Sequence, residues 1–145
     1  MPDRRIVKQA LNMYNYIPWA MENGKIKNII LVDDDEAIFH TIQIVLNGPE
    51  YKLVYFSDVP SAIRHIKSGK GTDLIILDIM MPGHSGLDFL DMLRNEGVKV
   101  PVIVISAIDT ARAAVKALKK GAADYITKPF ELEDIKEAIY GLLKE

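Results

Sequence analysis

The chain has 145 residues, of which 49% are hydrophobic and 26% are charged, and its formal net charge at pH 7 is −2. This balance predicts one soluble domain and excludes a disordered or membrane-spanning composition, while the small net charge disfavours direct binding to nucleic acid or anionic lipid. The absence of cysteine excludes disulfides and thiolate metal sites. Without a signal peptide or a membrane-length apolar run, which takes roughly 20 residues, we expect a cytoplasmic protein with no membrane partner.

The first 26 residues are expected to be an N-terminal helical extension or linker, outside a main domain at residues 27–145. Apolar residues recur within Asp3–Ile17 at the spacing of one helix face, and Pro18 would end that helix. A lone helix would expose this stripe to water, so we expect it to dock on the domain or to form a dimer. The alternative is a linker remnant. The stripe consists of Val7, Ala10, Leu11, Tyr14 and Ile17.

From Lys27 onward, strand-like apolar runs alternate with helix-like patterns. Strands are expected over residues 28–32, 52–56, 74–77, 100–105 and 124–126. Helices are expected over residues 35–46, 59–67, 86–95, 110–119 and 132–143. Strands that alternate with helices predict an α/β fold, with a five-stranded parallel sheet covered by helices on both faces.

The third predicted strand ends in a carboxylate that its apolar pattern does not explain. Asp78 follows the apolar run 74–77 and precedes a Met-Met-Pro-Gly turn. In open α/β sheets, ligands bind outside the carboxyl ends of the strands, so an acid at this point is placed for chemistry. The alternative is an aspartate that only caps the next loop.

Other predicted strands also end in polar residues. Three aspartates, residues 33–35, follow the first strand, Ser106 ends the fourth, and Lys128 follows the fifth. Since the carboxyl ends of parallel strands share one edge, these side chains should meet Asp78. Clustered carboxylates repel, which predicts a bound hard cation, with Mg²⁺ as the best candidate. A lysine and a hydroxyl at the same point suit the oxygens of a phosphoryl group in transfer.

Five segments together resemble the receiver domain of two-component response regulators, over about Lys27 to Glu145. They are Val32-Asp33-Asp34, Leu77 to Gly83, Gly86, Ile105-Ser106-Ala107 and Tyr125 to Phe130. The resemblance implies a CheY-like, flavodoxin-like doubly wound sheet with strand order 2-1-3-4-5. It also implies a phosphorelay switch, whose partner is a sensor histidine kinase or a His-phosphotransfer protein.

The resemblance further assigns roles to individual residues. It implies that Asp78 accepts the phosphoryl group as an acyl phosphate and that Lys128 pairs with Asp78 and then with that group. Mg²⁺ would be held by Asp34, Asp78 and the backbone carbonyl of Met80, with Asp33 acting mainly through water. The chain would catalyse its own phosphorylation and dephosphorylation, but it is best described as a signalling switch.

Two residues are implied as the switch itself. Ser106 would move to hydrogen-bond the phosphoryl group, and Tyr125 would turn inward as it does so, although a half-buried strand tyrosine is the alternative. This motion would reshape the surface around the fourth helix, the fifth strand and the last helix. The effector stays unidentified, as does the choice between a stand-alone receiver and a fragment, and a homodimer is possible.

The resemblance also implies that two further positions set how long the phosphorylated form lasts. They lie two residues after the acceptor and two after the hydroxyl, and here they are Met80 and Ile108. Neither side chain can orient a water or accept its proton, so we expect a long-lived phosphorylated form.

Two other functions are less well supported by the residues. A haloacid-dehalogenase-type, Mg²⁺-dependent phosphatase is suggested by the spacing of Asp33 and Asp35, but Ala37 stands where that family has Thr or Val, and its downstream acid pair is not seen. An inactive receiver-like interaction module is disfavoured because every chemical position is filled.

Overall fold

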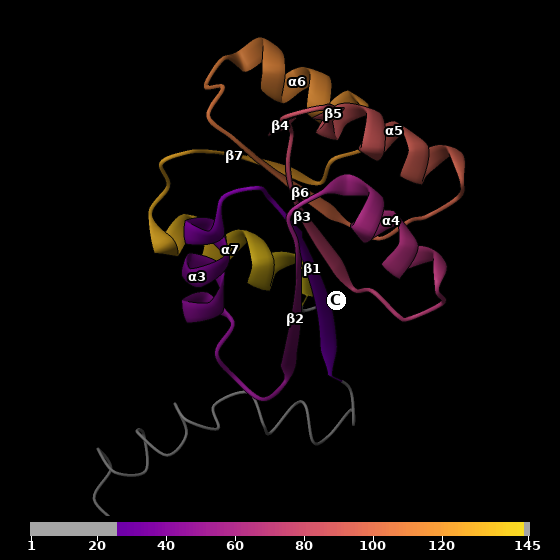
Figure 1. Ribbon diagram of the computed structural model, residues 1–145. Helices are drawn as coiled ribbons and strands as arrows, with labels where there is room; N and C mark the ends of the chain where they lie inside the picture. Colours follow the sequence, from indigo (N-terminus) through magenta and orange to yellow (C-terminus); the bar gives the residue numbers. More distant parts are fainter. Residues whose placement is uncertain (1–25, 144–145) are drawn as a thin grey trace, which may run out of the picture.

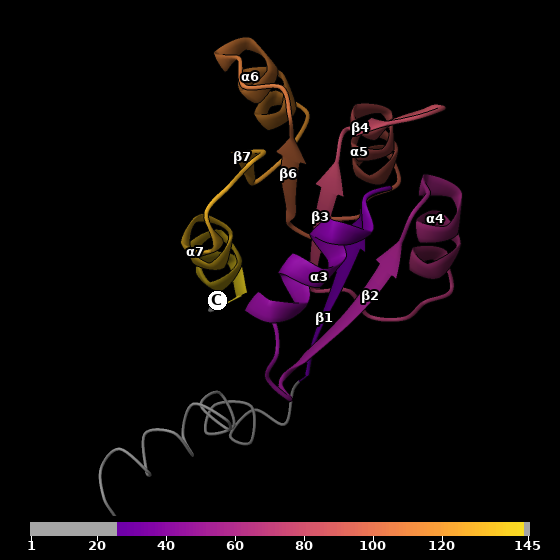
Figure 2. The ribbon, with the colours of Figure 1, turned by 60° about the vertical axis from the view of Figure 1, so that its left-hand side comes forward.

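The computed structural model describes residues 26–143, so the predicted N-terminal helix lies outside the described residues. The described chain forms three layers, with a central sheet between two layers of helices (Figure 1). Figure 2 shows α3 (Glu36–Val45) and α7 (Leu132–Leu143) on one side of the sheet, and α4 (Val59–Lys67) and α5 (Gly86–Asn95) on the other. Within residues 26–143, no helix is long and apolar enough to cross a membrane.

The central sheet has five parallel strands in the order β2-β1-β3-β6-β7. Numbered among themselves, these strands have the order 2-1-3-4-5, which confirms the expected flavodoxin-like fold. The strands are β1 (Lys27–Val32), β2 (Tyr51–Phe56), β3 (Leu74–Asp78), β6 (Val102–Ser106) and β7 (Asp124–Thr127). The remaining helix, α6 (Ala111–Lys119), lies between β6 and β7 in the sequence.

A short hairpin replaces the simple turn expected after the third strand. In it, β4 (Met80–Met81) pairs antiparallel with β5 (His84–Ser85) around Pro82-Gly83. Gly83 has a φ of 77°, a left-handed conformation that glycine adopts without strain. Two-residue strands are too short to produce a periodic pattern, which is why the sequence did not predict them.

Both faces of the central strands are apolar. Because successive side chains of a strand alternate between the two faces, Ile30, Val32 and Leu77 contribute to one core and Ile29, Leu31 and Ile76 to the other. The first core packs against α4, α5 and α6, and the second against α3 and α7. Because both faces of the sheet are buried, the strands appear in the sequence as uninterrupted apolar runs. The packing on both faces also holds in place the strand ends that carry the polar residues.

Candidate functional site

Polar side chains gather at the carboxyl edge of the sheet. Asp33 directly follows β1, Asp78 ends β3 and Ser106 ends β6, and these three strands are neighbours in the sheet. The three residues are 0%, 3% and 0% exposed, respectively. Lys128 comes from the segment after β7 and reaches the same point, where its ammonium contacts two of the acids. The structure therefore brings together residues that are up to 95 positions apart.

Three carboxylates form a compact cluster there. One oxygen atom from each of Asp33, Asp34 and Asp78 lies within 4.8 Å of the others. Backbone amides orient the two buried acids, since Asp35 N donates to Asp33 Oδ1 at 2.9 Å and Met80 N donates to Asp78 Oδ1 at 2.9 Å. Asp34 is exposed, so the cluster is open to solvent on its side. A set of carboxylate oxygens with one open side matches the ligands that a hard divalent cation prefers.

Lys128 bridges the two buried acids. Its Nζ donates to Asp33 Oδ2 at 2.9 Å and to Asp78 Oδ2 at 3.2 Å. The resemblance implied the pairing with Asp78 only, and the shorter contact to Asp33 was not expected. An ammonium has three donors, so one lysine can serve both carboxylates.

Burial and the neighbouring charges shift the pKa values of Asp33 and Lys128. Burial raises the pKa of Asp33, and the nearby charge of Asp78 adds to this, although hydrogen bonds from Lys128 and the Asp35 amide act in the opposite direction. Burial alone would lower the pKa of Lys128, but the hydrogen bonds and charges of Asp33 and Asp78 outweigh it and raise that pKa. Lys128 therefore stays protonated at neutral pH, and its positive charge lies against the two buried acids.

Ser106 and Tyr125 are connected through the backbone of Ile108. Ile108 N donates to Ser106 Oγ at 3.0 Å, and the Tyr125 hydroxyl donates to Ile108 O at 2.6 Å. Tyr125 is half-buried and packs against the core that includes α5 and α6. Any rotation of the Ser106 side chain removes the acceptor of the Ile108 amide, in the same loop that anchors the tyrosine. The sequence contained no signal for this link, because it depends on a backbone carbonyl.

Gly86 fixes the backbone at Asp78. A Cβ atom at Gly86 would lie 2.5 Å from Ile79 Cα and 2.7 Å from Asp78 O, distances that atoms in a folded protein do not adopt. The absence of a side chain lets the start of α5 lie directly against the end of β3. Met80, by contrast, is 53% exposed, and Ile108 is half-buried.

Asp35, the third acid of the run, has a separate structural role. It is the N-cap of α3, where its Oδ1 accepts from Ala37 N at 2.9 Å. The haloacid-dehalogenase alternative used Asp35 as its second acid. In this structure the Asp35 side chain instead caps the amino end of α3.

Comparisons with known proteins agree with this geometry. The family described as "Response regulator receiver domain" matches residues 29–140. Among curated relatives, the alkaline phosphatase synthesis transcriptional regulatory protein SphR of Synechococcus elongatus is 33% identical over 80% of this chain and 48% of its own length. The uncharacterized transcriptional regulatory protein YkoG of Bacillus subtilis is 35% identical over 86% of this chain and 53% of its own length.

Solved structures show the same likeness. The receiver domain of the Francisella response regulator 1452 superposes with a TM-score of 0.75 at 30% identity, covering 81% of this chain and 97% of that chain. The receiver domain of a putative Luxo repressor protein from Vibrio parahaemolyticus has a TM-score of 0.77 at 28% identity, covering 82% and 91%. These comparisons give the phosphatase alternative no support.

The chain spans about half the length of these two curated relatives. The family match, in contrast, covers most of residues 27–145 and includes the whole acidic cluster, Ser106 and Lys128. The chain therefore belongs to the response regulator receiver domain family.

Proposed function

We propose that this protein is a phosphorylation-operated switch, in which Asp78 accepts a phosphoryl group from a histidine kinase or a His-phosphotransfer protein. The observation that carries the proposal is the position of the Asp78 carboxylate, held by the Met80 amide at 2.9 Å and the Lys128 ammonium at 3.2 Å within the acidic cluster. A carboxylate oxygen attacks phosphorus, an O–P bond forms, and the bond from phosphorus to the donor's histidine nitrogen breaks.

The cluster supports a role for Mg²⁺ in this reaction. Asp34, Asp78 and the backbone carbonyl of Met80 would hold the ion, with Asp33 acting mainly through water, because all four supply the oxygen atoms that Mg²⁺ prefers. When bound, the ion neutralises charge on the acids and on the incoming phosphoryl oxygens. Lys128 complements the ion, because its ammonium screens Asp33 and Asp78 from each other and then donates to the phosphoryl oxygens.

The link from Ser106 to Tyr125 supports a route from the site to the surface. When Ser106 turns to donate its hydroxyl to the phosphoryl group, the Ile108 amide loses its acceptor, which lies 3.0 Å away. The loop then shifts, and with it the carbonyl that holds the Tyr125 hydroxyl. The result is a changed surface on α6, β7 and α7, which a partner or a second copy of the chain can read.

The relatives suggest what this surface controls. SphR and YkoG are both named as transcriptional regulatory proteins, so we propose that the switch governs a transcriptional output in the cytoplasm through an effector domain or partner protein. Direct binding of DNA by residues 27–145 is not part of the proposal, because the chain has a formal net charge of −2.

Intact-mass spectrometry after incubation with acetyl phosphate tests the proposal. The mass should rise by one phosphoryl group with Mg²⁺ present and stay unchanged with a chelator. Asp78→Asn should abolish the increase. Asp124→Asn is the matched control, since it makes the same change at the amino end of β7, away from the cluster, and should leave the increase intact. An increase that survives Asp78→Asn would refute the assignment.

A further inference from the structure

A buried hydroxyl group on the α3 side of the sheet has no hydrogen-bond partner. Tyr55, next to the last residue of β2, is half-buried as a whole, but its hydroxyl oxygen is shielded from solvent and has no partner among residues 26–143. A phenol hydroxyl that leaves water ordinarily gains a partner inside the protein, because an unpaired polar group in the interior is unfavourable. The described structure therefore leaves the donor of Tyr55 unused.

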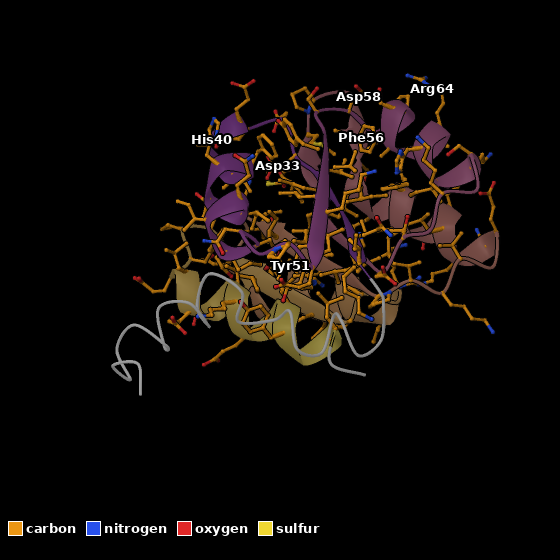
Figure 3. All side chains as sticks on the ribbon, turned by 90° about the horizontal axis from the view of Figure 1, so that it is seen from below. Asp33, His40, Tyr51, Phe56, Asp58 and Arg64 are labelled. Atoms are coloured by element: carbon orange, nitrogen blue, oxygen red, sulfur yellow. The ribbon has the colours of Figure 1, made fainter. Side chains whose placement is uncertain are left out.

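The pairing of β1 with β2 places the Tyr55 side chain on the same face as Asp33. Tyr55 is in register with Leu31, and both contribute to the core beneath α3 and α7. Because side chains alternate along a strand, Asp33, two residues after Leu31, continues the same face. The pairing extends this far, since Asp33 N donates to Phe56 O at 3.1 Å. Figure 3 shows Asp33 and His40 of α3 on one side of the strands, with Phe56 on the other.

The aromatic ring of Phe39 holds Tyr55 in this position. Phe39 lies on α3 and stacks on Tyr55, with ring centroids 4.7 Å apart and an interplanar angle of 10°. Helix α3 begins directly after the acidic run 33–35, and its N-cap is Asp35. The stack therefore fixes the Tyr55 ring between β2 and the helix that starts at the acidic cluster.

The charges of the nearby acids act on the Tyr55 hydroxyl. Its pKa is raised by burial first, and then by the negative charges of Asp33, Glu36, Asp34 and Asp35. Two of these acids, Asp33 and Asp34, belong to the carboxylate cluster. A hydroxyl with a raised pKa keeps its proton at neutral pH, so Tyr55 offers a neutral donor to groups that carry negative charge.

Asp33 requires such a donor when the cluster holds a divalent cation. In the structure, Asp33 Oδ2 accepts from the ammonium of Lys128 at 2.9 Å. A cation bound by the same carboxylates repels this ammonium, and in the proposed reaction Lys128 turns to the phosphoryl oxygens. Asp33 then loses a donor within a buried site. A neutral hydroxyl can replace that donor without repelling the cation.

We propose that Tyr55 is a positioning residue of the cation site, whose hydroxyl donates to the Asp33 carboxylate when the cluster is occupied. The hydrogen bond then orients Asp33 toward the water through which it acts on the ion. Outer partners of this kind fix the direction of a metal ligand and raise the affinity of the site. The inference rests on the proposed function, because it concerns the same cation.

Isothermal titration calorimetry with magnesium chloride tests the proposal in the full chain. Tyr55→Phe removes only the hydroxyl and keeps the ring that stacks on Phe39. We expect Mg²⁺ to bind about tenfold more weakly, the lower end of the range of about 10–100-fold for loss of an outer partner. The matched control is Tyr51→Phe, which makes the same change at the opposite end of β2 and should leave the affinity unchanged. Equal affinities of the two variants would overturn the proposal, whereas a wild-type chain that binds no Mg²⁺ would overturn the proposed cation site with it.

Thermal unfolding with and without Mg²⁺ separates positioning from a merely structural role. With a chelator present, the Tyr55 hydroxyl has no partner to lose, so Tyr55→Phe should leave the melting temperature unchanged or raise it. At one Mg²⁺ concentration, the increase in melting temperature should be smaller for Tyr55→Phe than for Tyr51→Phe, because a more weakly bound ion stabilises the folded state less. A lower melting temperature with the chelator, together with an equal increase on adding Mg²⁺, would show a packing role alone and would also reject the proposal.

Discussion

Both edges of the sheet contain buried carboxylates, but the two edges differ in whether these carboxylates have hydrogen-bond partners. At the carboxyl edge, Asp33 and Asp78 share the ammonium of Lys128 and have the exposed Asp34 beside them. At the amino edge, Glu50 is as deeply buried, and its carboxylate has no hydrogen-bond partner outside its own residue among residues 26–143. A cluster with a shared cation and an open side can take up a ligand, whereas the Glu50 carboxyl is packed into the loop before β2 beside Gly48.

The largest effect should come from removing cluster acids. Replacing Asp33 and Asp34 together with Asn should weaken Mg²⁺ binding by at least about 10–100-fold, the range seen even when an outer partner of a metal site is lost. Isothermal titration calorimetry measures this directly. Asp35→Asn removes one adjacent carboxylate from the N-cap of α3, where Asn also caps well, and should leave the affinity nearly unchanged. Equal losses in both variants would mean that the cluster does not bind the ion.

Removing the shared cation should destabilise the carboxyl edge. Lys128→Met leaves two buried carboxylates without their ammonium, and we expect a loss of about 1–3 kcal/mol in the free energy of unfolding when divalent cations are absent. Urea denaturation measures the loss. Lys120→Met is the control, because Lys120 pairs with the partly exposed Asp91 at 2.6 Å and such surface pairs contribute only about 0–1 kcal/mol. A smaller loss for Lys128→Met than for Lys120→Met would contradict this account of the site.

Gly86 tests how tightly the backbone at Asp78 is held. Gly86→Ala places a methyl group against Ile79 Cα and Asp78 O, and we expect destabilisation of about 1–3 kcal/mol from overpacking. Gly141 is the control within α7, because a Cβ atom there meets nothing within 4 Å. Gly141→Ala should stabilise the protein by about 0.5–1 kcal/mol through helix propensity. Calorimetric unfolding of the two variants should thus show shifts of opposite sign.

We expect the lifetime of the phosphorylated state to depend on the exposed Met80 side chain. Met80→Glu adds a group that can orient water for attack, while the backbone at residue 80 keeps its carbonyl, so we expect dephosphorylation to become several-fold faster. Phosphorylation itself should still occur. The measurement is the decay of the phosphorylated mass in the presence of Mg²⁺. Equal decay rates for the wild type and Met80→Glu would show that this side chain does not govern the timing.

The smallest expected effect is the pH dependence of the stability that Glu50 contributes at the amino edge of the sheet. Burial raises the pKa of Glu50 above its usual value of 4.5, although a backbone hydrogen bond acts in the opposite direction. An acid whose pKa is raised on folding contributes stability at low pH that is lost as the pH rises through the folded pKa. The wild-type chain should therefore gain stability on acidification from pH 7 towards 4.5, relative to Glu50→Gln. A difference between the two that stays constant with pH would argue against a raised pKa.

The sequence predicted the secondary structure of this protein better than the contacts between its side chains. The helices at residues 59–67, 86–95 and 132–143 were expected with the bounds they have, because apolar periodicity and capping residues are local signals. The Lys128–Asp33 contact and the Ser106–Ile108–Tyr125 link were not expected, since they depend on distances that only the folded chain defines. Glu50 was also missed, because an acid in a loop ordinarily indicates an exposed position.

The central claim, that Asp78 carries the phosphoryl group, is tested most directly by locating the modified residue. Borohydride reduces an acyl phosphate to an alcohol, so a phosphorylated aspartate becomes homoserine and can be found by sequencing peptides in the mass spectrometer. We predict homoserine at position 78 after treatment with acetyl phosphate and Mg²⁺, and unmodified aspartate at positions 33 and 34. Homoserine at position 33 or 34, with position 78 unchanged, would contradict the proposed site.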